Sequence, residues 1–203
     1  MTPITLPEVG FKASRPLLVE QVSASKSGER LISFIEYGDP YWVIDITTDP
    51  LKAAPLLAVE IFARLARGGL RTILYSPVCL PQTYWGQPDH IALSKTGILQ
   101  NITDQQLLNM SGVYAGLVIM AGDYISLTTA DYHSLHQVVT GGVATSGGSL
   151  SLRVWPPVMS YITVGAVVTF KNPKMNTRLV PNSFSLSPDN LPVATWRLTE
   201  VPR

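Results

Sequence analysis

The side chains that could do paired acid–base chemistry lie near the end of "YWVIDITTDP", where a strand-like run gives way to a helical pattern. Asp45 and Asp49 are the two carboxylates of this stretch. Four residues of extended chain place them roughly 13 Å apart. The carboxylate pairs that hydrolyse glycosides lie closer together than this. Because Asp49 directly precedes Pro50, the sequence favours a capping or turn role for it.

The histidines suggest metal binding, but their spacing does not support it. His133 and His136 form an H-x-x-H pattern, which supplies two metal ligands when it lies on a helix. The surrounding residues are typical of a strand, in which side chains three apart point to opposite faces. Neither Asp131 nor His90 adds a third ligand at a suitable spacing, and Cys79 is the sole cysteine. The sequence therefore predicts no metal, no cofactor and no enzymatic centre.

The segment "PVCLPQTYWGQPDH" is the best candidate for contact with another molecule. Its prolines and glycine are typical of a long loop. Tyr84, Trp85 and His90 form the candidate interaction loop. Aromatic side chains of this kind stack on sugar rings, fill a partner's pocket or enter the protein's own core. Burial in the core or against a partner chain is favoured over sugar binding.

The elements that would position these residues are mainly strands. Short runs of β-branched and aromatic residues, separated by turn residues, predict a mostly β protein with an antiparallel β-sandwich or barrel-like core. In "YWVIDITT", three apolar side chains share one face of the strand, namely those of Trp42, Ile44 and Ile46. We therefore expect Trp42 to be a core anchor.

One covering α-helix is expected at about residues 52–67. Pro55 would remove a backbone donor from a helix interior, so the regular part should begin near it. Gly68 and Gly69 end the helical pattern. Apolar residues recur at three and four positions, which predicts a stripe that packs on the core with Phe62 as a second anchor. The stripe consists of Leu57, Ala58, Ile61, Phe62 and Leu65.

The whole chain, residues 1–203, is expected to form a single β-rich domain. An alternative is a division around a loop at 77–95. Residues 1–76 would then hold strands and the helix, and residues 96–203 would form a β-sandwich or barrel.

The composition limits the classes of partner. Apolar residues make up 46% of the chain and charged residues 14%, against about 25% charged in ordinary soluble domains. This scarcity of charge suggests surface that is buried against other chains. A formal net charge of +1 argues against nucleic-acid recognition. The sequence also lacks an apolar run of membrane-spanning length and a signal peptide, so we expect no membrane insertion and synthesis in a cytoplasm.

Ordered fragments from about Glu29 onward carry a family resemblance. They are "YWVIDI", a "DPL" turn, a helix closing with "LARGG", and then "AGDYISL", "LHQVV", "SLRVWPP", "GAVVTFKNP", "TRLV" and "ATWRLTEV". Each fragment consists mainly of a strand-like run with aromatic, glycine and proline residues in or beside it. The order of the fragments along the chain makes the resemblance specific. Together they resemble the distal tail, or tail-tip, structural proteins of long-tailed (siphovirus-type) bacteriophages.

The resemblance implies a structural virion protein of the tail tip, made in the host cytoplasm. Such a protein is a β-rich ring subunit that connects the tail tube to the hub and the receptor-binding apparatus. The implied partners are further copies in a hexameric or trimeric ring, the tail tube protein, the tail hub protein and, in addition, tail fibres. The alternative is a tail-associated binding module that contacts host-surface glycan or anchors a side fibre. A cell-wall enzyme would need paired carboxylates or a metal triad that the sequence does not offer.

Overall fold

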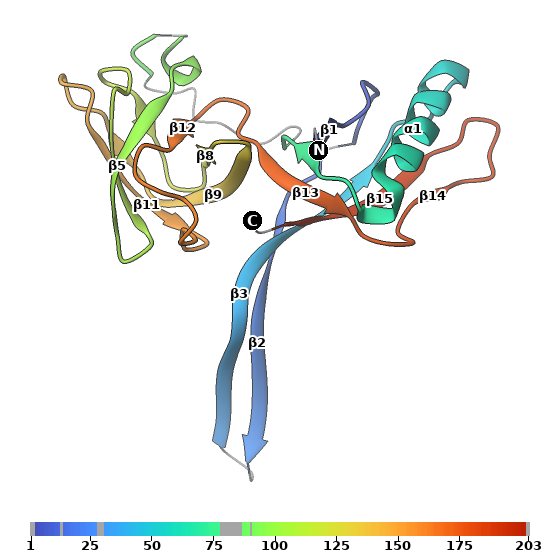
Figure 1. The fold of residues 1–203 in the computed structure, drawn as a ribbon, viewed down its shortest axis with the longest axis horizontal. Helices are drawn as coiled ribbons and strands as arrows, with labels where there is room; N and C mark the ends of the chain where they lie inside the picture. Colours follow the sequence, from blue (N-terminus) through green and yellow to red (C-terminus); the bar gives the residue numbers. More distant parts are fainter. Residues whose placement is uncertain (1–2, 13, 28–30, 78–86, 90, 202–203) are drawn as a thin grey trace.

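The computed structural model describes residues 3–12, 14–27, 31–77, 87–89 and 91–201 and is mostly β, which confirms the predicted fold class. Figure 1 shows two parts. The middle of the chain forms a barrel, and segments from both ends of the chain form an open sheet that carries the helix. We call this second part the terminal sheet.

The terminal sheet has the strand order β1-β4-β13-β15-β3-β2, with β14 paired to β15. The β1–β4 pair is parallel and the other pairs are antiparallel. The strands are β1 (Ile4–Thr5), β2 (Leu17–Ser27), β3 (Leu31–Thr47), β4 (Ile73–Tyr75), β13 (Met175–Leu179), β14 (Ser185–Leu186) and β15 (Ala194–Glu200).

The barrel closes in the order β11-β6-β5-β12-β8-β9. Side chains alternate between its interior and its outside. In β11, Leu150, Leu152 and Val154 are buried, while Ser151 and Arg153 are exposed. The barrel strands are β5 (Gly97–Thr103), β6 (Leu107–Ser111), β8 (Tyr124–Thr129), β9 (Tyr132–Thr140), β11 (Leu150–Trp155) and β12 (Val167–Thr169). A small ribbon of β7 (Val118–Ile119) and β10 (Gly142–Val143) and the 3-10 turn η2 (Ala92–Ser94) complete this part.

The chain order makes the barrel an insertion between β4 and β13 of the terminal sheet. The alternative division around 77–95 would group β13, β14 and β15 with the barrel. Strand pairing instead places them beside β4 and β3. The two hydrophobic cores follow the same separation, one drawn from residues 92–170 and the other mostly from the two ends of the chain.

The predicted helix is confirmed as α1 (Ala53–Ala66), which the 3-10 turn η1 (Arg67–Gly69) follows. Gly69 has a φ of 98°, and a side chain there would collide with the carbonyl oxygen of Leu179 in β13. A glycine is therefore required where the end of the helix meets the sheet.

The predicted packing stripe of α1 is wrong in most of its members. The buried face consists of Val59, Phe62 and Ala66. Leu57, Ile61 and Leu65 are instead 59%, 56% and 46% exposed, and Ala58 is also exposed. The helix has two apolar faces, and the sheet contacts the one with the bulky ring of Phe62. Periodicity alone does not distinguish which of two apolar faces is buried.

Both expected core anchors, Trp42 and Phe62, lie in the core of the terminal sheet, 2% and 4% exposed. Phe62 packs on Trp196, with ring centroids 5.6 Å apart. Trp42 faces the barrel. Its indole N–H donates a hydrogen bond of 2.8 Å to the carbonyl of Leu135 in β9, and its ring lies 5.9 Å from that of Tyr124. Trp42 thus joins the two parts of the molecule.

Candidate functional site

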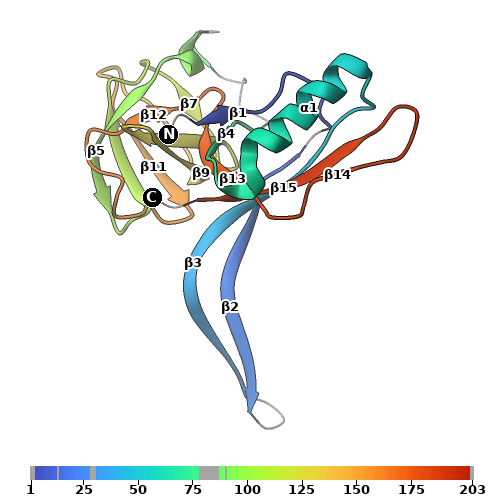
Figure 2. The ribbon, with the colours of Figure 1, turned by 45° about the vertical axis from the view of Figure 1, so that its right-hand side comes forward.

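A long hairpin, formed by β2 and β3, projects from the body of the protein. Figures 1 and 2 show it extending away from both the barrel and the terminal sheet. The two strands pair from Leu17↔Val43 to Ser27↔Leu31. By contrast, β15 pairs with β3 only between Val43 and Thr47. Within the described residues, the outer part of the hairpin is therefore a ribbon with no third strand beside it.

Apolar side chains are exposed on both faces of this hairpin. Phe34 and Ile35 are neighbours in β3, so they point to opposite faces, and they are 69% and 60% exposed. Ile32, Tyr37 and Val22 of the same ribbon are exposed as well. An isolated two-stranded ribbon is only marginally stable in water, and large exposed apolar patches mark interaction sites. The hairpin therefore has the features of an interaction site.

The outward face of α1 provides a second exposed apolar surface. Leu57, Ile61 and Leu65 follow one another at four-residue spacing and form what we call the outer helix stripe. Leu70, just after η1, is 70% exposed. This surface belongs to a different element from the hairpin. The terminal sheet therefore carries two unlike apolar surfaces.

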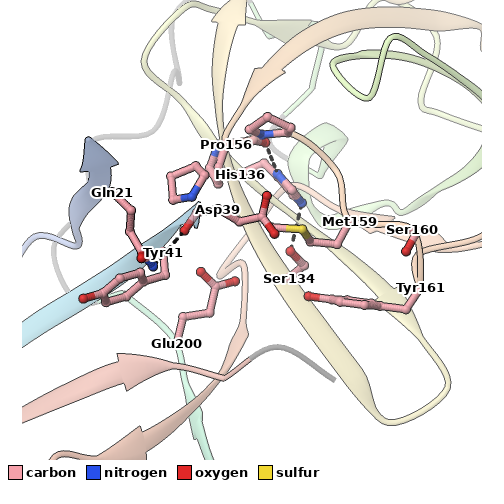
Figure 3. A pocket seen from close by; sticks show the side chains of 12 residues that line it. Gln21, Asp39, Tyr41, Ser134, His136, Pro156, Met159, Ser160, Tyr161 and Glu200 are labelled. Atoms are coloured by element: carbon pink, nitrogen blue, oxygen red, sulfur yellow. Dashed lines mark hydrogen bonds between the residues drawn. The ribbon is translucent and has the colours of Figure 1, made fainter. Parts of the chain in front are cut away.

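A cavity of about 500 Å³ lies at the base of the hairpin, where the hairpin meets the barrel and β15. Figure 3 shows side chains from all three parts around it. We call it the junction cavity. It is lined by Gln21, Asp39, Pro40 and Tyr41 of the hairpin, Ser134 and His136 of β9, Glu200 of β15, and a segment after β11 that contains Pro156, Pro157, Met159, Ser160 and Tyr161.

His136 is held in a fixed orientation on the barrel side of the cavity. Its Nδ1 lies 2.8 Å from the carbonyl oxygen of Pro156 and its Nε2 lies 2.9 Å from Oγ of Ser134. Complete burial lowers the pKa of His136 to about 4, so the ring is neutral at pH 7. The neutral ring donates from Nδ1 to the carbonyl, and the Ser134 hydroxyl donates to Nε2.

The Ser134–His136 contact resembles the pair that activates a nucleophilic serine. Two features point instead to an internal structural bond. Ser134 and His136 are only 2% and 1% exposed. The group that orients the histidine ring is the carbonyl of Pro156, whereas in a Ser-His-Asp catalytic triad this group is a carboxylate. Both ring nitrogens are thus satisfied within the protein.

Glu200 brings a carboxyl group into the junction cavity, as Figure 3 shows. One of its oxygens accepts a hydrogen bond of 3.1 Å from the backbone N–H of Trp42. Burial raises the pKa of Glu200 to about 7, and the hydrogen bond from Trp42 opposes this rise only in part. Near neutral pH this carboxyl group is therefore close to half ionised.

The histidines of the H-x-x-H pattern lie in strand β9, as the sequence indicated. His136 faces the junction cavity, whereas His133 bonds Thr128 of β8 at 2.9 Å. In the part of the chain that the structure describes, no group of three or more histidine, cysteine or acidic side chains could hold a metal.

The aspartates of the opening stretch also separate. Asp45 forms an exposed ion pair with Arg197, at 2.7 Å. The proposed capping role of Asp49 is wrong for α1. The N-cap residue is Lys52, which makes no side-chain capping bond. The chain runs three residues beyond Asp49 before the helical turn begins.

The candidate interaction loop falls outside the described residues, since Tyr84, Trp85 and His90 all do. Its role stays a prediction. Sequence reasoning missed the grouping of Ser134, His136 and Glu200. The i, i+2 spacing of Ser134 and His136 on one strand face was a usable signal, but the approach of Glu200 depends on long-range strand pairing.

Fold and site together define a class of β protein in which a closed barrel is inserted into an open sheet that carries a projecting apolar hairpin. Comparison of the chain with protein-family models gave no match, and comparison with curated protein sequences gave none either. Among the helices of the described residues, none is long and apolar enough to cross a membrane.

Proposed function

We propose that this protein is a structural virion protein of a bacteriophage tail tip, a ring subunit that connects the tail tube to the hub and the receptor-binding apparatus. The observation that carries the proposal is the projecting hairpin with apolar side chains on both faces. Such a hairpin fits a protein whose function lies in contacts between copies.

The two apolar surfaces favour a ring over a two-fold dimer. A two-fold interface pairs the same surface on both partners, whereas a head-to-tail interface joins two different surfaces and closes into a ring when the rotation allows it. The hairpin and the outer helix stripe are two different surfaces on one chain. In the proposed ring, the hairpin of one copy lies against the next copy and covers apolar area on both.

The free strand edge gives a second reason for assembly. Strand β2 is at the end of the sheet order, so one of its edges has no partner strand within the described residues. Exposed edges of this kind promote uncontrolled pairing unless something covers them. A closed ring would cover the edge in every copy.

Placement in the virion tail tip is supported by the resemblance of the ordered fragments between "YWVIDI" and "ATWRLTEV" to distal tail proteins. The proposed partners are further copies in a hexamer or trimer, the tail tube protein, the tail hub protein and tail fibres. The proposal includes no enzymatic activity.

Native mass spectrometry with negative-stain imaging tests the ring. We expect a closed hexamer or trimer with a central hole. Replacement of both Phe34 and Ile35 by serine should shift the protein to monomer, because it removes apolar side chains from both faces of the hairpin. The matched control is Val164→Ser, which changes a 60% exposed apolar residue on the barrel and should leave the oligomer intact.

A strict monomer over a wide concentration range would contradict a self-assembling ring. Equal loss of assembly in the Val164→Ser control would contradict a specific role of the hairpin. Binding of purified tail tubes to the ring, and loss of this binding in the Phe34/Ile35 variant, would test the placement at the tail end.

A further inference from the structure

The walls of the junction cavity combine apolar surface with carboxyl groups. Proline, methionine and tyrosine side chains form much of its surface, and Asp39 and Glu200 contribute carboxylates from two different strands. Among its lining residues in the described chain, none is lysine or arginine. The cavity therefore has acidic groups with no basic partner of their own in its wall.

The carboxyl group of Glu200 has capacity for another partner. One of its oxygens accepts a hydrogen bond from the backbone N–H of Trp42, at 3.1 Å. A carboxylate has two oxygens and about four acceptor positions. Figure 3 shows the group pointing into the cavity, between Tyr41 and Ser134. A donor inside the cavity could therefore reach it without displacing the bond to Trp42.

We propose that the junction cavity is a binding site for a monovalent organic cation, an alkylammonium or alkylguanidinium group on an aliphatic stem. Glu200 and Asp39 supply the counter-charge. Tyr41, Tyr161 and Met159 supply apolar and aromatic surface for the stem and for the cation itself.

The alternatives fit the cavity less well. An anion would face two carboxyl groups with no lysine or arginine to offset them. A bare divalent metal would need several converging ligands, and no group of three acidic, histidine or cysteine side chains is close enough among the described residues. The cavity volume of about 500 Å³ lies within the range of pockets that bind small organic molecules.

Cation binding should depend on pH through Glu200. The titratable groups that line the cavity around it are Asp39 and Tyr41 of β3, His136 of β9 and Tyr161 after β11. The pKa of Glu200 is about 7, while His136, with a pKa of about 4, remains neutral over the relevant range. Affinity should rise about tenfold from about pH 6 to about pH 8, as the carboxyl group of Glu200 ionises.

The site does not depend on the proposed ring, but its position suggests a source for the cation. Gln21 of β2 and Tyr41 of β3 both line the cavity, so it adjoins the hairpin surface. The same chemistry is present in a free amine and in a lysine or arginine side chain of a neighbouring copy. The experiment below separates the two sources.

Isothermal titration calorimetry with n-butylammonium and ethylguanidinium chloride tests the site at constant ionic strength. We expect saturable binding to the wild-type protein, and no saturable binding of n-butanol, the neutral probe. Glu200→Gln should weaken binding about tenfold or more, and it retains an oxygen that accepts the N–H of Trp42. The matched control is Asp45→Asn, which removes a carboxylate of β3 that lies outside the cavity and should leave affinity unchanged.

Equal affinity for n-butanol, or unchanged cation affinity in Glu200→Gln, would overturn the proposal, as would the lack of saturable binding to wild type. Native mass spectrometry of the assembled protein with the bound probe then identifies the source. Dissociation of the assembly would show that a neighbour's side chain occupies the cavity. An intact assembly with probe bound would show a site for a free amine. Failure of the ring itself would leave the calorimetric result unaffected.

Discussion

The barrel and the terminal sheet differ in their strand edges, because the barrel is closed and the terminal sheet is open. In the barrel, the order β11-β6-β5-β12-β8-β9 returns on itself, so each strand has a neighbour on both sides. In the terminal sheet, the order begins at β1 and ends at β2, and β2 continues into the projecting hairpin. The barrel strands thus pair only with one another, while the terminal sheet has a free edge at β2 among the described residues.

This difference indicates which part of the molecule would carry the contacts of the proposed ring. A closed barrel removes edges, and an open sheet retains them. The exposed Phe34 and Ile35 lie on the open part, as do the outer helix stripe and the free edge of β2. The barrel can therefore differ in shape or in surface chemistry without changing the proposed ring contacts.

The two parts are nevertheless coupled at their junction. Trp42 of the terminal sheet donates to the carbonyl of Leu135 in β9, and the side chain of Leu135 packs in the core of the sheet. A substitution at this contact should therefore reduce the stability of both the barrel and the terminal sheet.

The largest expected effect comes from Trp42→Ala. Removal of this 2% exposed indole leaves a cavity and takes away a donor to the carbonyl of Leu135, and should lower the free energy of unfolding by about 3 to 5 kcal/mol. Chemical denaturation measures this. Trp42→Phe keeps an aromatic ring but loses the N–H donor, so a smaller loss is expected. An unchanged melting midpoint in Trp42→Ala would contradict the junction role.

The next effect concerns the pH dependence of stability, where two groups of the junction cavity oppose one another. The pKa of Glu200 rises from 4.5 to about 7 on folding, so its contribution to stability falls as pH rises through this range. The pKa of His136 falls from 6.5 to about 4, so its contribution increases as pH rises from about 4 to 6.5. The two slopes should largely cancel in the wild type.

Glu200→Gln should remove this cancellation. Of these two cavity groups only His136 then contributes, and its contribution to the free energy of unfolding should increase by about 3 kcal/mol between about pH 4 and about pH 6.5. Denaturation curves at a series of pH values measure it. Ser160→Ala changes a residue of the same cavity that does not titrate, so this variant should show the pH dependence of stability of the wild type. A Glu200→Gln profile parallel to the wild type would show that Glu200 does not titrate in this range.

The smallest effect on stability is expected for the hairpin. Serine at both Phe34 and Ile35 should change the unfolding free energy of the monomer by only about 0.5 kcal/mol, because these side chains are exposed. The same change should abolish the oligomer. Denaturation at a protein concentration below that of assembly separates the two quantities. A large loss of monomer stability would show that the side chains support folding as well as association.

The sequence predicted the helix and the strands better than it predicted which of their faces pack together. Period-two alternation identified the strand of Trp42, and period-3.6 recurrence identified α1 within one residue of each end. Both are local signals. The burial of Phe62 and the exposure of Ile61, its neighbour on the helix, depend on which apolar face meets the sheet, and a local pattern does not contain that information.

The same limit explains why the junction cavity was not predicted. Trp42, His136 and Glu200 are each about 60 residues or more from the next along the chain. They meet because β15 pairs with β3 and because the barrel packs against that pair. Strand pairing of such long range is set by the whole fold.

The position of β15 also has a consequence for synthesis on the ribosome. β15 lies between β13 and β3 in the sheet, yet the ribosome makes it after every strand of the barrel. The barrel segment is continuous, so its strands are all available before the terminal sheet can be completed. The base of the hairpin gains its neighbour strand only when β15 emerges. The nascent chain therefore cannot present a finished subunit until translation has passed this strand.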